Sequence, residues 1–176
     1  MHAFDLKKDT TLHWNYLGGP EIKEKYQIIL KEYLINKLNG LCLDCQKRYQ
    51  LNPLRILDCK TCNLEKLPSY RKVLTGRDLA YLEELNELLD KLKINHYYNE
   101  NLVRGLDYYT GVVFEHLLIK DNKKSVILGG GRYDHLFQQL GGIDLPAAGF
   151  ALGVDRLVNY LSSLKIHYGL SKRLRV

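Results

Sequence analysis

Residues 102–111 read LVRGLDYYTG, and residues 112–115, which follow directly, read VVFE. The β-branched and aromatic residues of the second segment predict a strand, and the first segment stands at its entrance. An arginine, an aspartate and two tyrosines between glycines would place a fixed cation and aromatic walls at the rim of a sheet. Such a rim can hold an anion and enclose a flat ring. The alternative is that Arg104 and Asp107 pair with each other while the tyrosines belong to the core.

A second segment, GGGRYD at residues 129–134, stands between a predicted strand and a predicted helix. Its glycines would let a ligand or another backbone come into contact, since no Cβ intervenes. No Gly-Lys-Ser/Thr follows, which excludes a phosphate-binding P-loop, and the glycine spacing excludes a dinucleotide fingerprint. The alternative for this segment alone is a hairpin strand that ends in a flexible turn.

A third segment, AAGFALGVDRL at residues 147–157, predicts a short strand of small residues followed by a helix. Arg156 falls in the first turn of that helix. An arginine beside the free N–H groups of a helix N-terminus favours bound phosphate. The alternative is an arginine that is simply solvated.

Hydrophobic periodicity predicts helices before the sheet and again after it. The pattern places helices at residues 20–40, 78–92, 134–140 and 154–164, strands at 10–17, 112–119 and 125–128, and an irregular segment at 41–70. The strand at 112–119 is apolar on both faces, so layers are expected on both sides of the sheet. The fold class is therefore α+β, an antiparallel sheet with packed helices that follows a mainly helical module. The clearest internal break falls near residues 94–100.

The 176 residues carry a formal charge of +6, from 26 basic and 20 acidic residues. This charge permits a polyanionic partner without requiring one. No apolar run is long enough to cross a bilayer, and nothing after Met1 resembles an export signal. A soluble, cytoplasmic protein without a membrane partner is expected.

Four cysteines occur as two Cys-x-x-Cys pairs, with thirteen residues between the pairs: Cys42, Cys45, Cys59 and Cys62. This spacing is that of a four-thiolate Zn²⁺ site, in which the ion replaces a core that the irregular segment lacks. Disulfides are the less expected use in a chain without an export signal. Four buried free thiols remain the alternative to zinc.

Taken together and in this order, the three segments resemble the histidyl-tRNA synthetase family. Residues 104–111 are similar to its histidine signature, residues 130–134 to its second signature, and residues 147–157 to motif 3 of class II synthetases. Residues 52–60, NPLRILDCK, are similar to a segment of the family's insertion. The resemblance covers residues 12–164. It implies three parts: the end of an upstream core segment at 1–20, a helical insertion module at 21–95, and the C-terminal part of the catalytic domain at 96–176.

The resemblance also implies an activity and its residues. The family activates L-histidine with ATP and Mg²⁺ to histidyl-adenylate, transfers the histidyl group to tRNA(His), and works as a homodimer. Arg104 matches the catalytic arginine that contacts the α-phosphate and the histidine carboxylate. Histidine binding is implied for Arg104, Tyr108, Tyr109, Tyr133, Gly129 and Gly130, and ATP binding for Arg156 and Gly153. The two arginines are expected to converge above one sheet.

Departures from the family pattern limit these expectations. Motifs 1 and 2 and the anticodon-binding domain are not found in the 176 residues, so a fragment that is inactive by itself is expected. One alternative is a synthetase-like regulatory subunit of histidine biosynthesis, although such relatives typically lose the intact signature at 104–109. Another alternative is a non-catalytic module in which the cysteine segment and the basic ends hold RNA. The basic ends are Lys7, Lys8, Lys172, Arg173 and Arg175.

Overall fold

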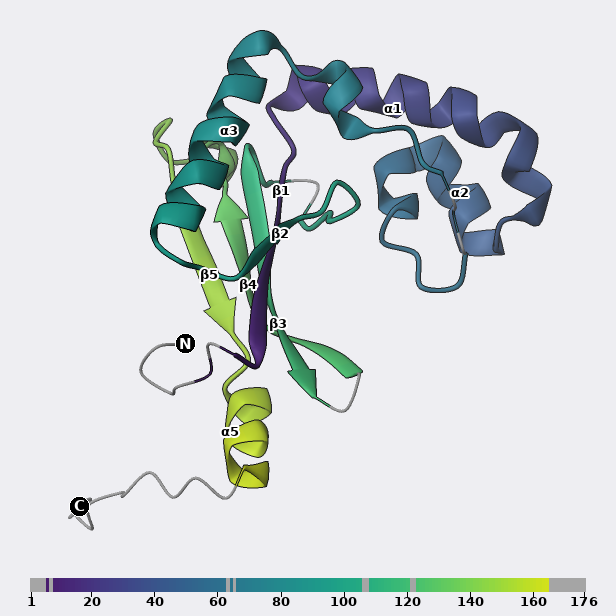
Figure 1. Ribbon diagram of the computed structural model, residues 1–176. Helices are drawn as coiled ribbons and strands as arrows, with labels where there is room; N and C mark the ends of the chain where they lie inside the picture. The colour runs from purple at the N-terminus through teal and green to yellow at the C-terminus, as the bar shows by residue number, and fades with distance from the viewer. Residues whose placement is uncertain are drawn as a thin grey trace.

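A computed structural model shows a five-stranded sheet with a helical arm extending from one end (Figure 1). The structure describes residues 6, 8–62, 64, 66–105, 108–120 and 123–164. Asp107 of the first signature and most of the basic ends, namely Lys7, Lys172, Arg173 and Arg175, lie outside the described residues.

The strand order is β2-β1-β3-β4-β5. The strands are β1 (Thr10–Tyr16), β2 (His96–Tyr98), β3 (Val112–Lys120), β4 (Lys123–Arg132) and β5 (Ala148–Leu152). All neighbouring pairs are antiparallel except β1 and β2, which run parallel. The expected α+β class with a mainly antiparallel sheet is confirmed. The short strand β2, which was not predicted, lies within residues 94–100, and the long helical connection after β1 allows this parallel return to the same sheet.

The helical arm begins with α1 (Pro20–Leu34), which has proline in its first turn, as predicted. The predicted helix at 20–40 is α-helical only to Leu34, and its end tightens into the 3₁₀ turn η2 (Ile35–Gly40). The expectation of an irregular segment at 41–70 was wrong in part. That segment contains α2 (Leu43–Leu51), of which only Cys45 is buried, so its sequence carries almost no helical stripe. Two further 3₁₀ turns follow, η3 (Pro53–Ile56) and η4 (Tyr70–Val73).

Three helices accompany the sheet. α3 (Gly76–Lys91) begins with a capping box between Thr75 and Asp78, and its apolar stripe packs on Trp14 of β1. The short α4 (Leu136–Gln139) follows β4. α5 (Val154–Ser163) places Leu157 and Tyr160 against the β3–β4 hairpin. α3 buries Leu82 and Leu89 of its predicted leucine stripe. The prediction for α5 was right for Leu157 but wrong for Val154 and Val158, which are exposed, and α4 buries no residue.

The arm and the sheet share one hydrophobic core. Buried residues of α1, η3 and η4 belong to the same cluster as Val113 of β3 and Tyr109 of the first signature. Tyr26 and Tyr70 both belong to this cluster, and their ring centroids lie 4.2 Å apart. The Tyr70 hydroxyl donates to the Leu17 carbonyl at 2.8 Å, which ties η4 to the end of β1. The arm is therefore packed on the sheet and does not hang free.

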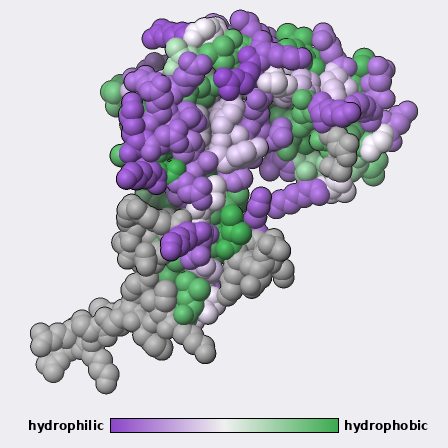
Figure 2. Space-filling view, viewed as in Figure 1, coloured by the Kyte–Doolittle hydropathy of each residue, from purple (hydrophilic) through white to green (hydrophobic). Residues whose placement is uncertain are grey.

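Hydrophilic side chains cover most of the surface around α3 in the view of Figure 2. Among the described residues, no helix has the length and apolar character needed to span a bilayer.

A buried asparagine holds the segment before the first signature. Asn15 of β1 is fully buried, and its amide donates to the carbonyls of Glu100 at 3.1 Å and Leu102 at 3.0 Å. Because buried backbone carbonyls need partners, this side chain determines where the chain turns before Arg104.

Replacing Asn15 should destabilise the whole fold. Asn15→Ala leaves two carbonyls without their donor, so we expect a loss of about 1–3 kcal/mol in the free energy of unfolding. Urea denaturation measures this change. Asn101→Ala, at an exposed position in the same loop, is the matched control and should change stability by less than about 0.5 kcal/mol. Equal effects of the two substitutions would contradict the role given to Asn15.

Candidate functional site

One face of the sheet is almost bare of side chains where β4 and β5 pair. Glu115 lies opposite Gly129, and Val113 lies opposite Gly131, which in turn lies opposite Gly149. Residues paired across antiparallel strands share a face, so these positions define what we call the glycine face. The missing Cβ atoms leave room for side chains from outside the sheet to lie against its backbone.

Arg104 lies flat on this glycine face. A Cβ at Gly129 would come within 2.5 Å of its guanidinium. The Nη1 atom donates to Oε1 of Glu115 in an ion pair whose side chains are 32% and 17% exposed. The guanidinium is thus oriented by a carboxylate and a backbone while part of it stays accessible. The alternative pairing of Arg104 with Asp107 falls on a residue outside the described part of the chain.

Three tyrosines continue the site beside Arg104. The ring centroids of Tyr108 and Tyr109 lie 4.5 Å apart, and those of Tyr109 and Tyr133 lie 5.9 Å apart. Tyr109 is buried against Gly131, whereas the Tyr133 hydroxyl lies over Gly149. Burial and the neighbouring Tyr108 hydroxyl raise the pKa of Tyr109, so its phenol stays neutral and can donate a hydrogen bond. The three rings together form an aromatic wall.

A cavity of about 240 Å³ adjoins this wall on the side of α1. It is lined by three signature residues, Tyr108, Tyr109 and Thr110. Residues of α1, α4 and the turn before α4 complete the lining: Pro20, Lys23, Glu24, Gln27, His135 and Gln139. Lys23 donates to the Tyr109 carbonyl at 2.5 Å, so α1 also fixes the backbone of the signature.

Backbone hydrogen bonds connect the first two signature segments. The amide of Thr110 donates to the Arg132 carbonyl at 2.7 Å, and the Thr110 hydroxyl accepts from the amide of Asp134 at 3.0 Å. Gly105 has φ +42°, a conformation that favours glycine, and a Cβ there would collide with Tyr108. The two segments thus form one unit.

The third segment meets the same strand. The Arg156 side chain is exposed and donates through Nη1 to the Val126 carbonyl of β4 at 2.6 Å. Gly153 caps α5, and its amide donates to the Ile127 carbonyl at 2.8 Å. Val126 precedes Gly129 by three residues, so Arg156 and Arg104 both contact β4.

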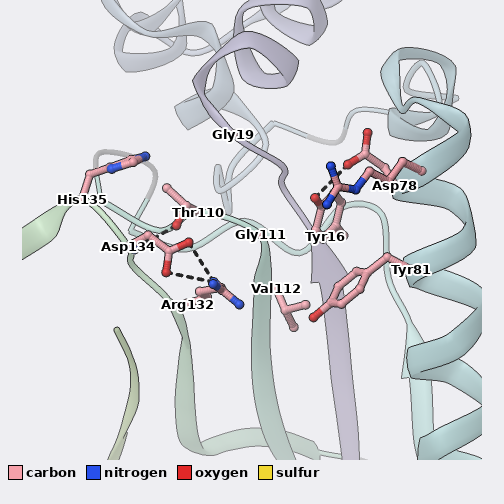
Figure 3. A pocket seen from close by; sticks show the side chains of 11 residues that line it. Tyr16, Gly19, Asp78, Tyr81, Thr110, Gly111, Val112, Arg132, Asp134 and His135 are labelled. Atoms are coloured by element: carbon pink, nitrogen blue, oxygen red, sulfur yellow. Dashed lines mark hydrogen bonds and ion pairs between the residues drawn. The ribbon is translucent and has the colours of Figure 1, made fainter. Parts of the chain in front are cut away.

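The opposite face of the sheet carries a larger cavity that the sequence did not predict (Figure 3). Its volume is about 410 Å³, and it lies between the end of the sheet and α3. The Arg132 Nε donates to Asp134 at 2.7 Å, and the Tyr16 hydroxyl donates to Asp78 at 2.8 Å. Burial opposes ionisation of Asp78, but hydrogen bonds from Thr75 and Tyr16 hold its pKa below the ordinary value. Asp78, Arg132 and Asp134 in this cavity therefore already have partners.

The predicted site residues divide into groups in the structure. Arg104, Tyr108, Tyr109, Tyr133 and Gly129 come together on the glycine face. A Cβ at Gly130 would lie on the other face and collide with Gly149 and Phe150 of β5, so its absence permits close approach of the two strands. The four cysteines meet in the helical arm, in a cluster of their own.

Sequence reasoning missed Glu115 and Gly149. Glu115 carried a readable signal, because it is the only carboxylate within the apolar strand at 112–119. Gly149 carried none, since its role depends on the pairing of β5 with β4.

Comparison with known proteins agrees with this geometry. Residues 41–157 match the profile of the family described as Histidyl-tRNA synthetase. A histidine–tRNA ligase of Fervidobacterium nodosum is 46% identical over 155 residues, covering 85% of this chain and 36% of the relative. The chain belongs to the histidyl-tRNA synthetase family. A histidine–tRNA ligase of Syntrophotalea carbinolica is 40% identical over 163 residues, covering 89% of this chain and 39% of the relative.

The fold matches that of a solved family member. The structure of the apo histidyl-tRNA synthetase of S. aureus superposes with a TM-score of 0.75 at 31% identity, covering 97% of this chain and 42% of that one. The chain thus spans between a third and a half of the length of these histidyl-tRNA synthetases.

The ion pair on the glycine face should be energetically coupled in this synthetase segment. A double-mutant cycle of Arg104→Ala and Glu115→Ala should give a coupling energy of about 1 kcal/mol, reduced from that of a buried pair because the Arg104 side chain is 32% exposed. Thermal or urea unfolding of the four proteins measures it. Additive effects, within about 0.3 kcal/mol, would remove Glu115 as the residue that holds Arg104.

Proposed function

We propose that this chain supplies the histidine pocket and the phosphate-binding arginines of a histidine–tRNA ligase. The observation that carries the proposal is the Arg104 guanidinium, fixed by Glu115 over Gly129 and adjoining the three-tyrosine wall. An amino acid with a carboxylate and an aromatic ring needs a cation and a flat surface side by side. Family membership over residues 41–157 supports the same function.

The proposed reaction has two steps. A carboxylate oxygen of L-histidine attacks the α-phosphorus of ATP, which arrives with Mg²⁺. A phosphorus–oxygen bond forms to give histidyl-adenylate, and the bond to the pyrophosphate leaving group breaks. A ribose hydroxyl of tRNA(His) then attacks the carbonyl carbon, and AMP leaves. Both steps gain from positioning and from positive charge placed where negative charge develops.

Arg104 is the proposed catalytic residue. Its guanidinium would contact the histidine carboxylate and the α-phosphate, bringing two anions together. The Glu115 carboxylate and the backbone at Gly129 orient the guanidinium before substrate arrives. A preoriented cation in a partly enclosed site stabilises a transition state without reorganisation at the moment of reaction.

The tyrosines are the proposed imidazole site. Tyr108, Tyr109 and Tyr133 present ring faces and hydroxyl groups, which suit a flat heteroaromatic ring with two nitrogens. The adjoining cavity of about 240 Å³ provides space beside two of these rings. Gly129 leaves room for the Arg104 guanidinium that would hold the substrate carboxylate, and Gly130 contributes by permitting close pairing with β5.

ATP would extend from Arg104 toward Arg156. In this proposal Arg156 leaves the Val126 carbonyl and binds the γ-phosphate, while Gly153 leaves space for the adenosine. Residues 1–20 and 96–176 then belong to the catalytic core, and residues 21–95 form the insertion module. The complete protein would work as a cytoplasmic homodimer, as the family does.

Removing the Arg104 guanidinium should impair catalysis more than substrate binding. In the complete enzyme, Arg104→Ala should slow histidine-dependent ATP–pyrophosphate exchange by about 10²–10³-fold, because a transition-state contact is lost. Histidine affinity, measured by titration calorimetry, should change far less. Arg71→Ala, at an exposed arginine, is the control and should keep normal exchange. An unchanged rate in Arg104→Ala would end the assignment.

A methyl group placed beneath Arg104 should have a similar kinetic effect without removing the charge. In Gly129→Ala the new Cβ would lie 2.5 Å from the guanidinium, which must move away from its position beside Glu115. We expect pyrophosphate exchange to fall at least about tenfold, since small displacements of catalytic groups cost large factors in rate. Circular dichroism should show a folded protein.

Gly76→Ala is the matched control for this glycine, because a Cβ there meets nothing within 4 Å. Wild-type exchange rates in Gly129→Ala would contradict the proposed position of Arg104.

A further inference from the structure

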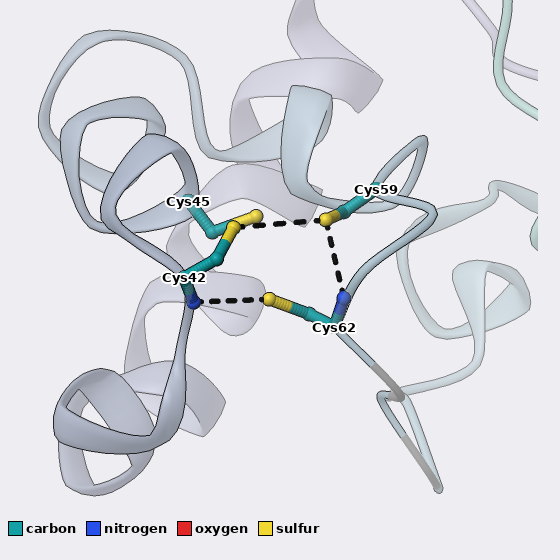
Figure 4. A group of neighbouring side chains, drawn as sticks. All are labelled: Cys42, Cys45, Cys59 and Cys62. Atoms are coloured by element: carbon teal, nitrogen blue, oxygen red, sulfur yellow. Dashed lines mark hydrogen bonds between the residues drawn. The ribbon is translucent and has the colours of Figure 1, made fainter.

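Four cysteine sulfurs converge in the helical arm (Figure 4). Cys42 caps the N-terminus of α2, Cys45 lies in its first turn, and Cys59 and Cys62 lie in the segment after η3. All four Sγ atoms lie within 4.8 Å of one another, and those of Cys42 and Cys59 are 3.9 Å apart. Zn–S bonds of about 2.3 Å in a tetrahedron put sulfurs about 3.8 Å apart. The cluster therefore needs only a small contraction to enclose one ion.

Backbone amides point at these sulfurs. The amide of Cys42 donates to the Cys62 Sγ at 3.2 Å, and the amides of Thr61 and Cys62 each donate to the Cys59 Sγ at 3.3 Å. Hydrogen bonds to a charged form stabilise that form, so this backbone favours thiolates. Thiolates, and not thiols, are the ligands of a metal ion.

The surrounding charge is suited to a metal–thiolate site. Residues 41–62 contain four basic side chains, Lys47, Arg48, Arg55 and Lys60, against two acidic ones, Asp44 and Asp58. One divalent ion bound by four thiolates carries two negative charges. The site would therefore leave this segment with no net charge, which lowers the cost of gathering four anionic sulfurs.

The same segment has little core of its own. α2 buries only Cys45, and the segment from Cys59 to Cys62 is half-buried or exposed. Its larger apolar residues, Leu54 and Ile56, belong to the core that the arm shares with the sheet. A cross-link at the sulfurs would connect the start of α2 to the segment after η3, and both would then be held on α1.

We propose that Cys42, Cys45, Cys59 and Cys62 bind one Zn²⁺ that fastens the 57–62 segment to α2 and completes the helical arm. Four protein ligands fill the tetrahedron and leave no position for water, so the ion is structural and takes no part in bond making. The proposal is independent of the catalytic function proposed above.

Metal content gives the first test. The 176-residue chain, purified under reducing conditions without added metal, should contain one zinc ion per chain by plasma mass spectrometry. After exchange with Co²⁺ it should show the intense visible bands of tetrahedral coordination and a near-ultraviolet thiolate charge-transfer band. Substoichiometric zinc, an octahedral Co²⁺ spectrum, or four thiols that react freely with Ellman's reagent would overturn the proposal.

Hydrogen exchange gives the second test. It distinguishes an ion that stabilises the local structure from one that binds without stabilising it. Chelation of the wild-type chain, or Cys62→Ser, should speed amide exchange within residues 43–62 by at least about tenfold, because metal binding and local folding are coupled. Amides of β3 and β4 should exchange unchanged. Thr61→Ala keeps every sulfur and backbone amide and should behave as wild type.

Chelation of zinc from the wild-type chain tests the proposal even if the Cys62→Ser variant does not fold. Zinc removal that leaves exchange in residues 43–62 unaltered would overturn the fastening role.

Discussion

Close approach of side chains to the backbone of β4 organises this molecule. Glycines at 129 and 131 leave the middle of a five-stranded sheet without Cβ atoms on one face, so a guanidinium and an aromatic ring lie directly against it. Arg104 is then restrained from below by backbone and from the side by Glu115. A side chain with four rotatable bonds becomes a fixed charge, which is the condition for electrostatic stabilisation of a reacting phosphate. Tyr109 of the tyrosine wall uses the same absence of a side chain two residues further along, at Gly131.

The helical arm packs against the residues that form the tyrosine wall. Its helices share a core with Val113 and Tyr109, and Lys23 of α1 holds the Tyr109 carbonyl. Movement of the arm would therefore alter the tyrosine wall. A zinc ion between α2 and the segment after η3 would reduce such movement where the apolar core is thin. The cysteine cluster and the proposed histidine pocket are thus connected through this shared core and the Lys23 hydrogen bond.

Much of this organisation could be read from residue patterns. The amphipathic stripe of α3, the proline at the start of α1 and the apolar runs of β3 and β4 all predicted the elements that form. α2 was missed because a nine-residue helix with one buried side chain leaves no periodic signal. β2 was missed for a different reason. Three residues paired in parallel with β1 depend on a partner some eighty positions away, and no local preference encodes that.

The sequence by itself determined the family and the principal chemical groups. The order of the three signature segments and the spacing of the cysteines are properties of the chain, since each follows from residue type and position alone. Tertiary structure decided which groups meet. Among the described residues Glu115 is the partner of Arg104, and Gly129 and Gly130 serve opposite faces. The physical reason is that strand register decides the face of every side chain, and register is established only when distant strands pair.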